Sequence, residues 1–424
     1  MAQLTPLTLK YNFSWTFIGN AVYAGCQWGM LVVMAKLGSP EMVGQFTLGL
    51  AVTAPVMMFT NLQLRAVQAT DAKQQYLFSD YLGLRLLGTT IALVVIATIA
   101  LISGYQWQTS LIILLVGLAK AFESISDVYY GLIQQHERMD RIAMSLMIKG
   151  SLSLLFLGMG VYISGNLVWG VVGLILAWAF VLIGYDIPSG VWLLKTSVED
   201  SQSPSHNRWR PRWHLKTLAK LSWLSLPLGL VMMLISLNDN IPRYLIKSYL
   251  GERSLGIFAS MAYLMVAGNM VVLALGQSAS PRLAKYYAQE NSQAFRTLLI
   301  KLVAVGAFLG GIAILVALLA GREILTLFYK PEYAEHSDIL IWLMLAAAIG
   351  YIGSFLGYGI TATRAFSYFL LPYLMMTGIT AIASVLLIPT YGLIGATWAL
   401  CAANVATCIM PIGILVLIHK GKQS

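Results

Sequence analysis

The chain has 424 residues, of which 58% are hydrophobic and only 10% are charged, and its formal net charge is +10. Its mean hydropathy is +0.75. A soluble domain carries roughly 25% charged residues, so the composition excludes an ordinary soluble protein and indicates an integral membrane protein. A positive charge of this size indicates nucleic-acid binding only in a soluble protein. In a membrane protein, the distribution of lysine and arginine between the two sides of the membrane indicates the orientation of the chain.

A helix that crosses a bilayer needs about 20 apolar residues, and the chain offers about a dozen such stretches. The predicted spans are 12–36, 42–64, 81–103, 107–132, 142–163, 167–194, 217–247, 254–278, 297–320, 338–362, 367–389 and 391–418. Asp186 and Pro188 interrupt the sixth span, which would then stop near Tyr185. The longest polar connector, 195–216, is too short to fold as a separate domain. We therefore predict an all-α membrane protein with about 12 transmembrane helices.

Lysine and arginine are distributed unequally between the two sets of connectors. If the N-terminus is inside, 20 of the 27 lie on the inner side and six on the outer side, with Lys120 inside a span. Positive residues are enriched on the cytoplasmic side, so both termini are predicted to be cytoplasmic. The basic, Trp-bearing stretch His206–Lys220 fits this membrane interface better than a nucleic-acid surface.

Two short patterns recur half a chain apart. Leu37–Phe46 reads LGSPEMVGQF and Leu250–Phe258 reads LGERSLGIF, and each follows the first span of its half. Trp169–Trp178 (WGVVGLILAW) and Tyr391–Trp398 (YGLIGATW) open the last spans. We predict two six-helix lobes, 1–194 and 217–424, joined by a cytoplasmic linker, 195–216. A pseudo-twofold axis along the membrane normal would relate them, as in alternating-access transporters.

These motifs, together with Asn238–Tyr249 (NDNIPRYLIKSY), Phe328–Ala334 (FYKPEYA) and Ile388–Ala396 (IPTYGLIGA), resemble the multidrug/oligosaccharidyl-lipid/polysaccharide exporter superfamily. The resemblance is strongest to its polysaccharide branch, the Wzx-type O-antigen/oligosaccharide flippases. It implies a V-shaped exporter fold and transfer of undecaprenyl-pyrophosphate-linked oligosaccharide between leaflets of the bacterial inner membrane. The related lipid II flippases usually have fourteen helices and several arginines in the first span, which here carries only Lys36.

Several charges are predicted to lie inside the membrane, where a charged side chain costs roughly 2.5–3.5 kcal/mol on insertion scales. Lys120, Glu123 and Asp127 share one face of the fourth span, and Asp239 and Arg243 are four residues apart in the seventh. Either these residues line a central cavity or they form salt bridges between helices, and both interpretations are open.

In the cavity interpretation a diphosphate headgroup needs cations. The candidates are Lys120 and Arg243, with Arg65, Arg364 and Lys36 at the cavity mouths, although Arg65 and Arg364 also fit interfacial anchors and Arg243 can reach the outer interface. Glu123, Asp127 and Asp239 would orient the cations, bind sugar hydroxyls or carry a coupling ion, H⁺ or Na⁺. No histidine falls inside a span and no ligand set for a metal is present, so neither a cofactor nor a metal site is predicted.

Three functions remain as alternatives. A flippase for lipid-linked oligosaccharide is the first, with that substrate, membrane lipids and other glycan-assembly proteins as partners. Cation-coupled drug export on the same fold would need an acidic and aromatic site, whereas this chain mixes both signs of charge. A membrane-embedded glycan polymerase or glycosyltransferase would need a positioned acid or base and a sizeable outer loop, and the outer connectors are short. The protein is therefore not predicted to be an enzyme.

Overall fold

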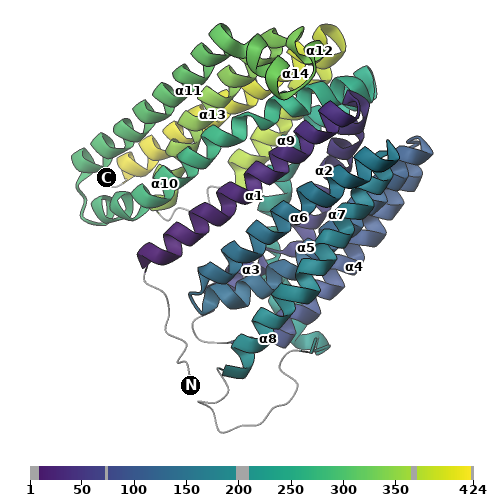
Figure 1. Ribbon diagram of the computed structural model, residues 1–424. Helices are drawn as coiled ribbons and strands as arrows, with labels where there is room; N and C mark the ends of the chain where they lie inside the picture. Colours follow the sequence, from purple (N-terminus) through teal and green to yellow (C-terminus); the bar gives the residue numbers. More distant parts are fainter. Residues whose placement is uncertain (1–8, 72–74, 197–209, 364–369, 422–424) are drawn as a thin grey trace. The chain divides into compact units, whose positions relative to one another are not determined.

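The computed structural model describes residues 9–71, 75–196, 210–363 and 370–421, and every regular element in these ranges is a helix (Figure 1). The chain divides into two compact units, unit 1 (Met1–Ser236) and unit 2 (Leu237–Ser424). The expectation of an all-α membrane protein is confirmed by this helical structure together with the apolar character of its long helices.

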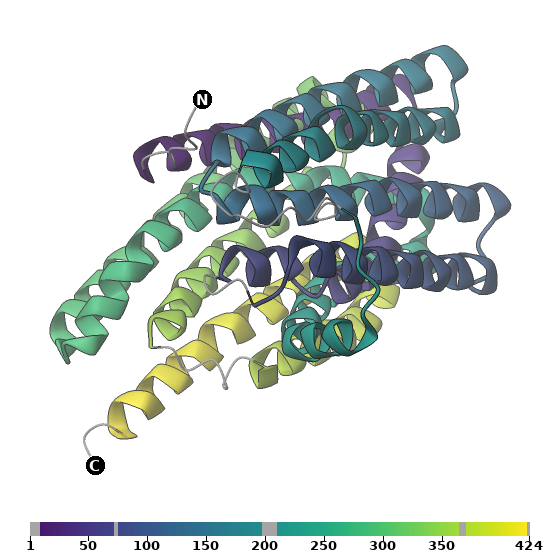
Figure 2. The ribbon, with the colours of Figure 1, turned by 90° about the horizontal axis from the view of Figure 1, so that it is seen from below.

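Unit 1 is a bundle of long helices that run side by side, drawn from purple to teal in Figures 1 and 2. Its elements are α1 (Leu9–Leu37), α2 (Pro40–Asn61), α3 (Leu64–Ala69), α4 (Phe78–Ile102), α5 (Trp107–Gln135), α6 (Met139–Ser164), α7 (Leu167–Val181), the π-helical turn η1 (Leu182–Asp186), α8 (Ile187–Thr196) and the first part of α9 (Leu215–Tyr263). Helix α5 packs against α2, α4 and α7, and α6 packs against α1 and α7. Because α5 is surrounded in this way, it can carry polar side chains that do not face lipid.

Unit 2 contains the remainder of α9 and five further helices. They are α10 (Met265–Ala288), α11 (Ser292–Phe328), α12 (Pro331–Ala334), α13 (Ser337–Ala362) and α14 (Leu370–Gly421). Helix α13 is central, since it packs against α10, α11 and α14. Its close neighbours include Gly310 of α11, where an added Cβ would lie 2.3 Å from the Cβ of Ala348. Small residues of this kind let helices approach closely in lipid, where packing replaces the hydrophobic effect as the driving force.

The predicted spans coincide with helices throughout the described residues. Nine helices in these residues are long and apolar enough to cross a membrane, and two of them, Leu215–Ala288 and Tyr373–Gly413, are long enough for two crossings each. Helix α5, which coincides with the predicted span 107–132, is not among these nine. The figure of twelve crossings therefore stays a prediction, while the helical, multi-pass character is established.

Two glycines divide the longest helices at the positions where the repeat motifs begin. Gly251 in α9 has φ 85° and Gly392 in α14 has φ 61°. Side chains with a Cβ avoid this left-handed region, so both helices break there and the chain starts a new span. The boundaries predicted near 247–254 and 389–391 fall at these two breaks.

The sixth predicted span continues through its polar interruption. Helix α7 passes into the π-helical turn η1 and then into α8, which runs to Thr196. The extra residue of a π turn changes the helical register locally, and it leaves Asp186 fully buried instead of facing lipid. The prediction that this helix stops near Tyr185 is therefore wrong. The helix continues through the whole of the predicted span 167–194.

The division between units falls inside α9 and not in the polar connector. The beginning of α9 belongs to unit 1, where Leu218 and Leu221 share a buried cluster with Leu62, Phe78 and Tyr129. The predicted lobe boundaries rest on the polar connector 195–216, whereas the division into units rests on contacts between residues. The predicted lobe boundaries therefore stay a prediction.

Candidate functional site

The charged face of α5 is the centre of a polar network in unit 1. Lys120 Nζ lies 2.6 Å from Glu123 Oε2 and 5.1 Å from the ring centroid of Trp178 on α7. The hydroxyl of Tyr23 on α1 donates a hydrogen bond of 3.0 Å to Glu123 Oε1. The predicted face thus contacts side chains of both α1 and α7.

Asp127, one turn further along α5, is shared by two arginines. Arg85 of α4 places Nη2 2.9 Å from Asp127 Oδ2, and Arg65 of α3 places Nη1 3.6 Å from Asp127 Oδ1. The two cations differ in exposure, since the Arg85 side chain is fully buried and that of Arg65 is 31% exposed. Arg85 is therefore committed to Asp127, whereas Arg65 is more accessible.

Neutral side chains hold each arginine in place. Arg85 Nη1 donates to Ser124 Oγ at 3.3 Å, and Ser124 in turn donates to Asn61 Oδ1 at 2.5 Å. Arg65 Nε donates to Gln134 Oε1 at 3.0 Å, and its guanidinium carbon lies 5.5 Å from the centre of the Tyr130 ring. These bonds fix the direction in which each guanidinium points.

A second ion pair, Lys149 with Asp186, lies within unit 1. Lys149 Nζ is 3.7 Å from Asp186 Oδ2, and both side chains are at most 1% exposed. Lys149 also donates to the Tyr130 hydroxyl at 2.9 Å, and Ser145 donates to Asp186 Oδ1 at 2.5 Å. The π turn η1 is what brings this carboxylate to α6, because it rotates Asp186 into the bundle.

Sequence reasoning missed three members of this network. Arg85 and Lys149 are among the 20 lysines and arginines that the sequence assigns to the inner side, and Asp186 interrupts the sixth predicted span, whereas all three are buried in the bundle. Both cations lie several residues inside the predicted spans 81–103 and 142–163, and this position was the available signal. Their partners could not be identified, because Lys149 and Asp186 are on different helices with no fixed sequence spacing.

The α5 network consists of four cations and three acids. The cations are Arg65, Arg85, Lys120 and Lys149, and the acids are Glu123, Asp127 and Asp186. The network therefore carries one positive charge more than its own carboxylates compensate. Because Asp127 is shared and Arg85 is the closer and fully buried partner, Arg65 is the cation with the least compensation.

Unit 2 has a cavity of about 500 Å³ with an acid on its wall. Asp239 lines it, together with the carboxamides of Asn238, Asn269 and Asn404 and the ring of Tyr358. Asp239 is exposed, and among the described residues no cation forms an ion pair with it. Arg243, one turn away, donates instead to Asn240 Oδ1 at 2.9 Å. Asp239 and Arg243 therefore form no direct ion pair in this structure, and the choice between cavity lining and a salt bridge for this pair stays a prediction.

Lys36, another predicted site residue, is not gathered with the α5 network. Lys36 lies in the last turn of α1, where a cation stabilises the helix terminus. The 22 residues of α2, about 33 Å of helix rise, separate that end from Arg65. Arg364 lies outside the described residues. Among the residues that the structure describes, no group of three His, Cys, Asp or Glu is placed to hold a metal ion.

Comparison with known proteins gives a consistent assignment. The family model "Polysaccharide biosynthesis protein" matches residues 9–287. A curated relative, "Capsular polysaccharide biosynthesis protein CapF" of Staphylococcus aureus, is 31% identical over 385 residues, which cover 91% of this chain and 93% of the relative.

Solved structures show the same fold. An inward-facing multidrug resistance MATE family transporter of the MOP superfamily has a TM-score of 0.72 at 12% identity, covering 96% of this chain and 99% of that one. Lipid II flippase MurJ in an inward closed conformation has a TM-score of 0.71 at 12% identity, covering 94% and 87%. At this identity the likeness concerns the fold alone, and the sequence matches concern the family. The chain belongs to the polysaccharide biosynthesis protein family and has the exporter fold of the multidrug/oligosaccharidyl-lipid/polysaccharide superfamily.

Proposed function

We propose that the protein is a flippase that carries an undecaprenyl-pyrophosphate-linked oligosaccharide from the inner to the outer leaflet of the bacterial cytoplasmic membrane by alternating access. The observation that carries this proposal is the uncompensated positive charge of the α5 network at Arg65. Charged groups inside a membrane protein are costly and are kept where a cavity or a partner needs them. A diphosphate is the anion that such a site would accept.

The chemistry of Arg65 suits a diphosphate. A guanidinium presents several N–H donors in one plane and binds phosphate oxygens in pairs. The contact to Asp127 is long, 3.6 Å, and the side chain is partly exposed, so a phosphate can approach without displacing Arg85. Lys120 is also partly exposed, at 24%, and is the second candidate ligand, although Glu123 already compensates its charge.

The Asp239 cavity is proposed as the place of a coupling ion, H⁺ or Na⁺, with Glu123 as the other candidate. A carboxylate in a cavity that is also lined by three asparagines offers the oxygen chemistry that hard cations prefer. The same carboxylate supports a second function, cation-coupled drug export, because an acidic cavity with aromatic walls can bind an organic cation. The cations of unit 1 favour the anionic, lipid-linked substrate instead.

The topology that belongs to this proposal has both termini in the cytoplasm and two lobes, 1–194 and 217–424. A glycan cargo and partner proteins of glycan assembly are proposed from the family and not from individual residues. The name of the curated relative refers to a capsular polysaccharide, so O-antigen is one of several glycans that the proposal admits. A glycan polymerase is disfavoured, because the solved structures that share the fold are transporters and a flippase.

The experiment is a flipping assay with purified protein in liposomes that contain undecaprenyl-pyrophosphate oligosaccharide. Arg65→Ala is expected to lower transfer about tenfold or more, since a charge-assisted hydrogen bond contributes roughly 1.5–3 kcal/mol. Lys120→Ala and Arg243→Ala test the two other cations. Arg322→Ala, an exposed cation on α11, is the control for loss of one positive charge, and it should transfer at the wild-type rate.

One outcome would contradict the proposed function, and a second would contradict the proposed binding site. Wild-type protein that transfers no lipid-linked glycan but exports organic cations along a gradient would place it with the drug exporters. Transfer that is unchanged in Arg65→Ala and Lys120→Ala would leave the function standing but remove the α5 network from substrate binding.

A further inference from the structure

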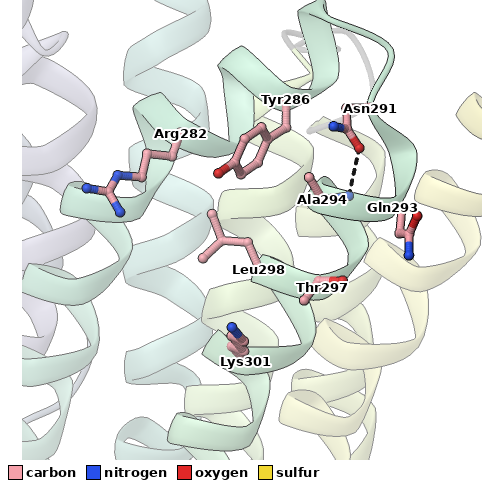
Figure 3. A pocket seen from close by; sticks show the side chains of 8 residues that line it. All are labelled: Arg282, Tyr286, Asn291, Gln293, Ala294, Thr297, Leu298 and Lys301. Carbon is pink, nitrogen blue, oxygen red and sulfur yellow. Dashed lines mark hydrogen bonds between the residues drawn. The ribbon is translucent and has the colours of Figure 1, made fainter.

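A basic hollow of about 460 Å³ lies beside the hairpin that joins α10 to α11 in unit 2 (Figure 3). We refer to it as the hairpin hollow. Side chains from both helices and from the turn between them line it, and none of them is acidic. The polar lining residues are Arg282, Tyr286, Asn291, Gln293, Thr297 and Lys301.

The two cations of the hairpin hollow have no ion-pair partner within the part of the chain that the structure describes. Arg282 comes from α10 and Lys301 from α11, and both side chains are exposed. The cations of unit 1 are different, since Arg85 and Lys149 are buried and paired with carboxylates. Arg282 and Lys301 line the same hollow, and no acidic residue lines it with them. Both cations are therefore available to an external anion.

The position of these cations along the helices matches a membrane interface. Lys301 lies about 14 Å of helix rise beyond the first residue of α11, and Arg282 lies about 9 Å before the last residue of α10. The neighbouring residues on α11 include Ile300, 55% exposed, and Phe308, 67% exposed. The hollow thus lies where apolar, lipid-facing surface begins, and a cation at this level needs a counter-ion.

Neutral groups complete an environment for a phosphate ester. The Thr297 hydroxyl, the Gln293 amide and the Tyr286 hydroxyl are hydrogen-bond donors that line the same hollow. Asn291 Oδ1 accepts from Ala294 N at 3.0 Å, the dashed line in Figure 3, and this cap fixes the start of α11. Leu298 forms an apolar wall, which suits a glycerol or acyl group better than a fully hydrated ion.

We propose that the hairpin hollow is a binding site for the phosphodiester headgroup of an anionic phospholipid. Arg282 and Lys301 bind the phosphate oxygens, Thr297 and Gln293 donate hydrogen bonds, and Leu298 contacts the apolar part of the lipid. Basic pockets between transmembrane helices bind anionic headgroups by this combination of charge and apolar contact. The site is separate from the α5 network and does not depend on which glycan the protein carries.

The hairpin provides a matched control for this proposal. Lys285 and Arg296 are exposed cations on the same two helices, and neither lines the hollow. The double variants R282A/K301A and K285A/R296A therefore change the net charge equally, and the control pair lies about 5 to 8 Å of helix rise nearer the hairpin turn. Only the first removes cations from the hollow.

The experiment measures lipid binding to the full-length protein in detergent by native mass spectrometry. Cardiolipin is the anionic probe, phosphatidylcholine is the zwitterionic probe, and inorganic phosphate and undecaprenyl diphosphate are competitors. We expect R282A/K301A to weaken cardiolipin binding roughly thirtyfold and K285A/R296A to weaken it less than threefold. Phosphatidylcholine binding should be unchanged in both, and R282K/K301R should retain cardiolipin binding, which confirms that the hairpin is folded.

Three results would overturn the proposal. Equal loss of cardiolipin in both double variants would mean that the hairpin attracts anions only through its overall charge. Displacement of cardiolipin by excess inorganic phosphate would identify a site for a free anion. Tighter binding of undecaprenyl diphosphate than of cardiolipin, lost in R282A/K301A, would identify a second substrate site instead of a phospholipid site.

Discussion

The two units carry opposite kinds of polar site. In unit 1 the charges of the α5 network pair with one another across α3, α4, α5, α6 and η1, and the network keeps one excess cation. In unit 2 the carboxylate of Asp239 opens on a cavity and pairs with no cation among the described residues. The halves share motifs at their helix breaks, yet their interiors have different chemistry.

This difference separates structural charges from available charges. A buried ion pair costs desolvation energy and is kept together by its geometry, so removing one partner leaves an uncompensated charge. A charge on the wall of a cavity is solvated or bound to a ligand, and its removal affects binding more than folding. Stability and transport should therefore respond differently to substitutions in the two units.

The largest effect on stability is expected at Lys149. Lys149→Ala leaves Asp186 buried without its cation, which should destabilise the protein by about 3–5 kcal/mol. Thermal unfolding in detergent, followed by circular dichroism, measures this as a lower Tm. The double variant Lys149→Met/Asp186→Leu removes both charges and should recover most of the loss. A Tm for Lys149→Ala equal to that of the wild type would mean that the pair is not buried in the membrane.

A smaller loss is expected at Arg85. Arg85→Met removes the closest partner of Asp127 and a donor to Ser124, but Arg65 stays beside the carboxylate. The expected cost is about 1.5–3 kcal/mol, the contribution of hydrogen bonds to charged groups. The same unfolding assay measures it. A loss as large as that of Lys149→Ala would show that Arg65 does not compensate Asp127.

Much of the fold, and one part of the candidate site, can be predicted from the sequence. The helices, their approximate bounds and the helix breaks at Gly251 and Gly392 follow from hydropathy and from the repeat motifs, because both are local properties of the chain. The polar face of α5 follows as well, since helical periodicity places Lys120, Glu123 and Asp127 together.

Partners across helices could not be predicted in the same way. Arg85 and Asp127 are 42 residues apart, and Lys149 depends on a π turn that rotates Asp186 into the bundle. Such pairs depend on how the helices pack, and one sequence gives no direct information on that packing. Asp239 illustrates the converse, because its spacing to Arg243 predicts a pair, whereas the hydrogen bond of Arg243 goes to Asn240.

Substitution of Arg65 tests whether unit 1 contains an available charge as well as structural ones. Its contact to Asp127 is long and partly exposed, so Arg65→Ala should cost less than about 1 kcal/mol of stability, as for other exposed pairs. Its effect on glycan-lipid transfer should nevertheless exceed that of Arg85→Lys, which keeps a buried cation. Unfolding and transfer measured on the same preparations would separate the two effects. A large loss of stability in Arg65→Ala would make this arginine structural, like Arg85.

The smallest effect on stability is expected at Asp239. Asp239→Asn keeps the shape of the side chain and removes a charge that forms no direct ion pair in the described residues, so unfolding should change by no more than about 0.5 kcal/mol. If the carboxylate holds a coupling ion, transfer by this variant should lose its dependence on an imposed proton or sodium gradient. Asn269→Ala, which alters the same cavity without removing a charge, should retain that dependence. Gradient-dependent transfer by Asp239→Asn would assign coupling to another acid, with Glu123 as the next to test, and would leave the cavity of unit 2 without a role in ion binding.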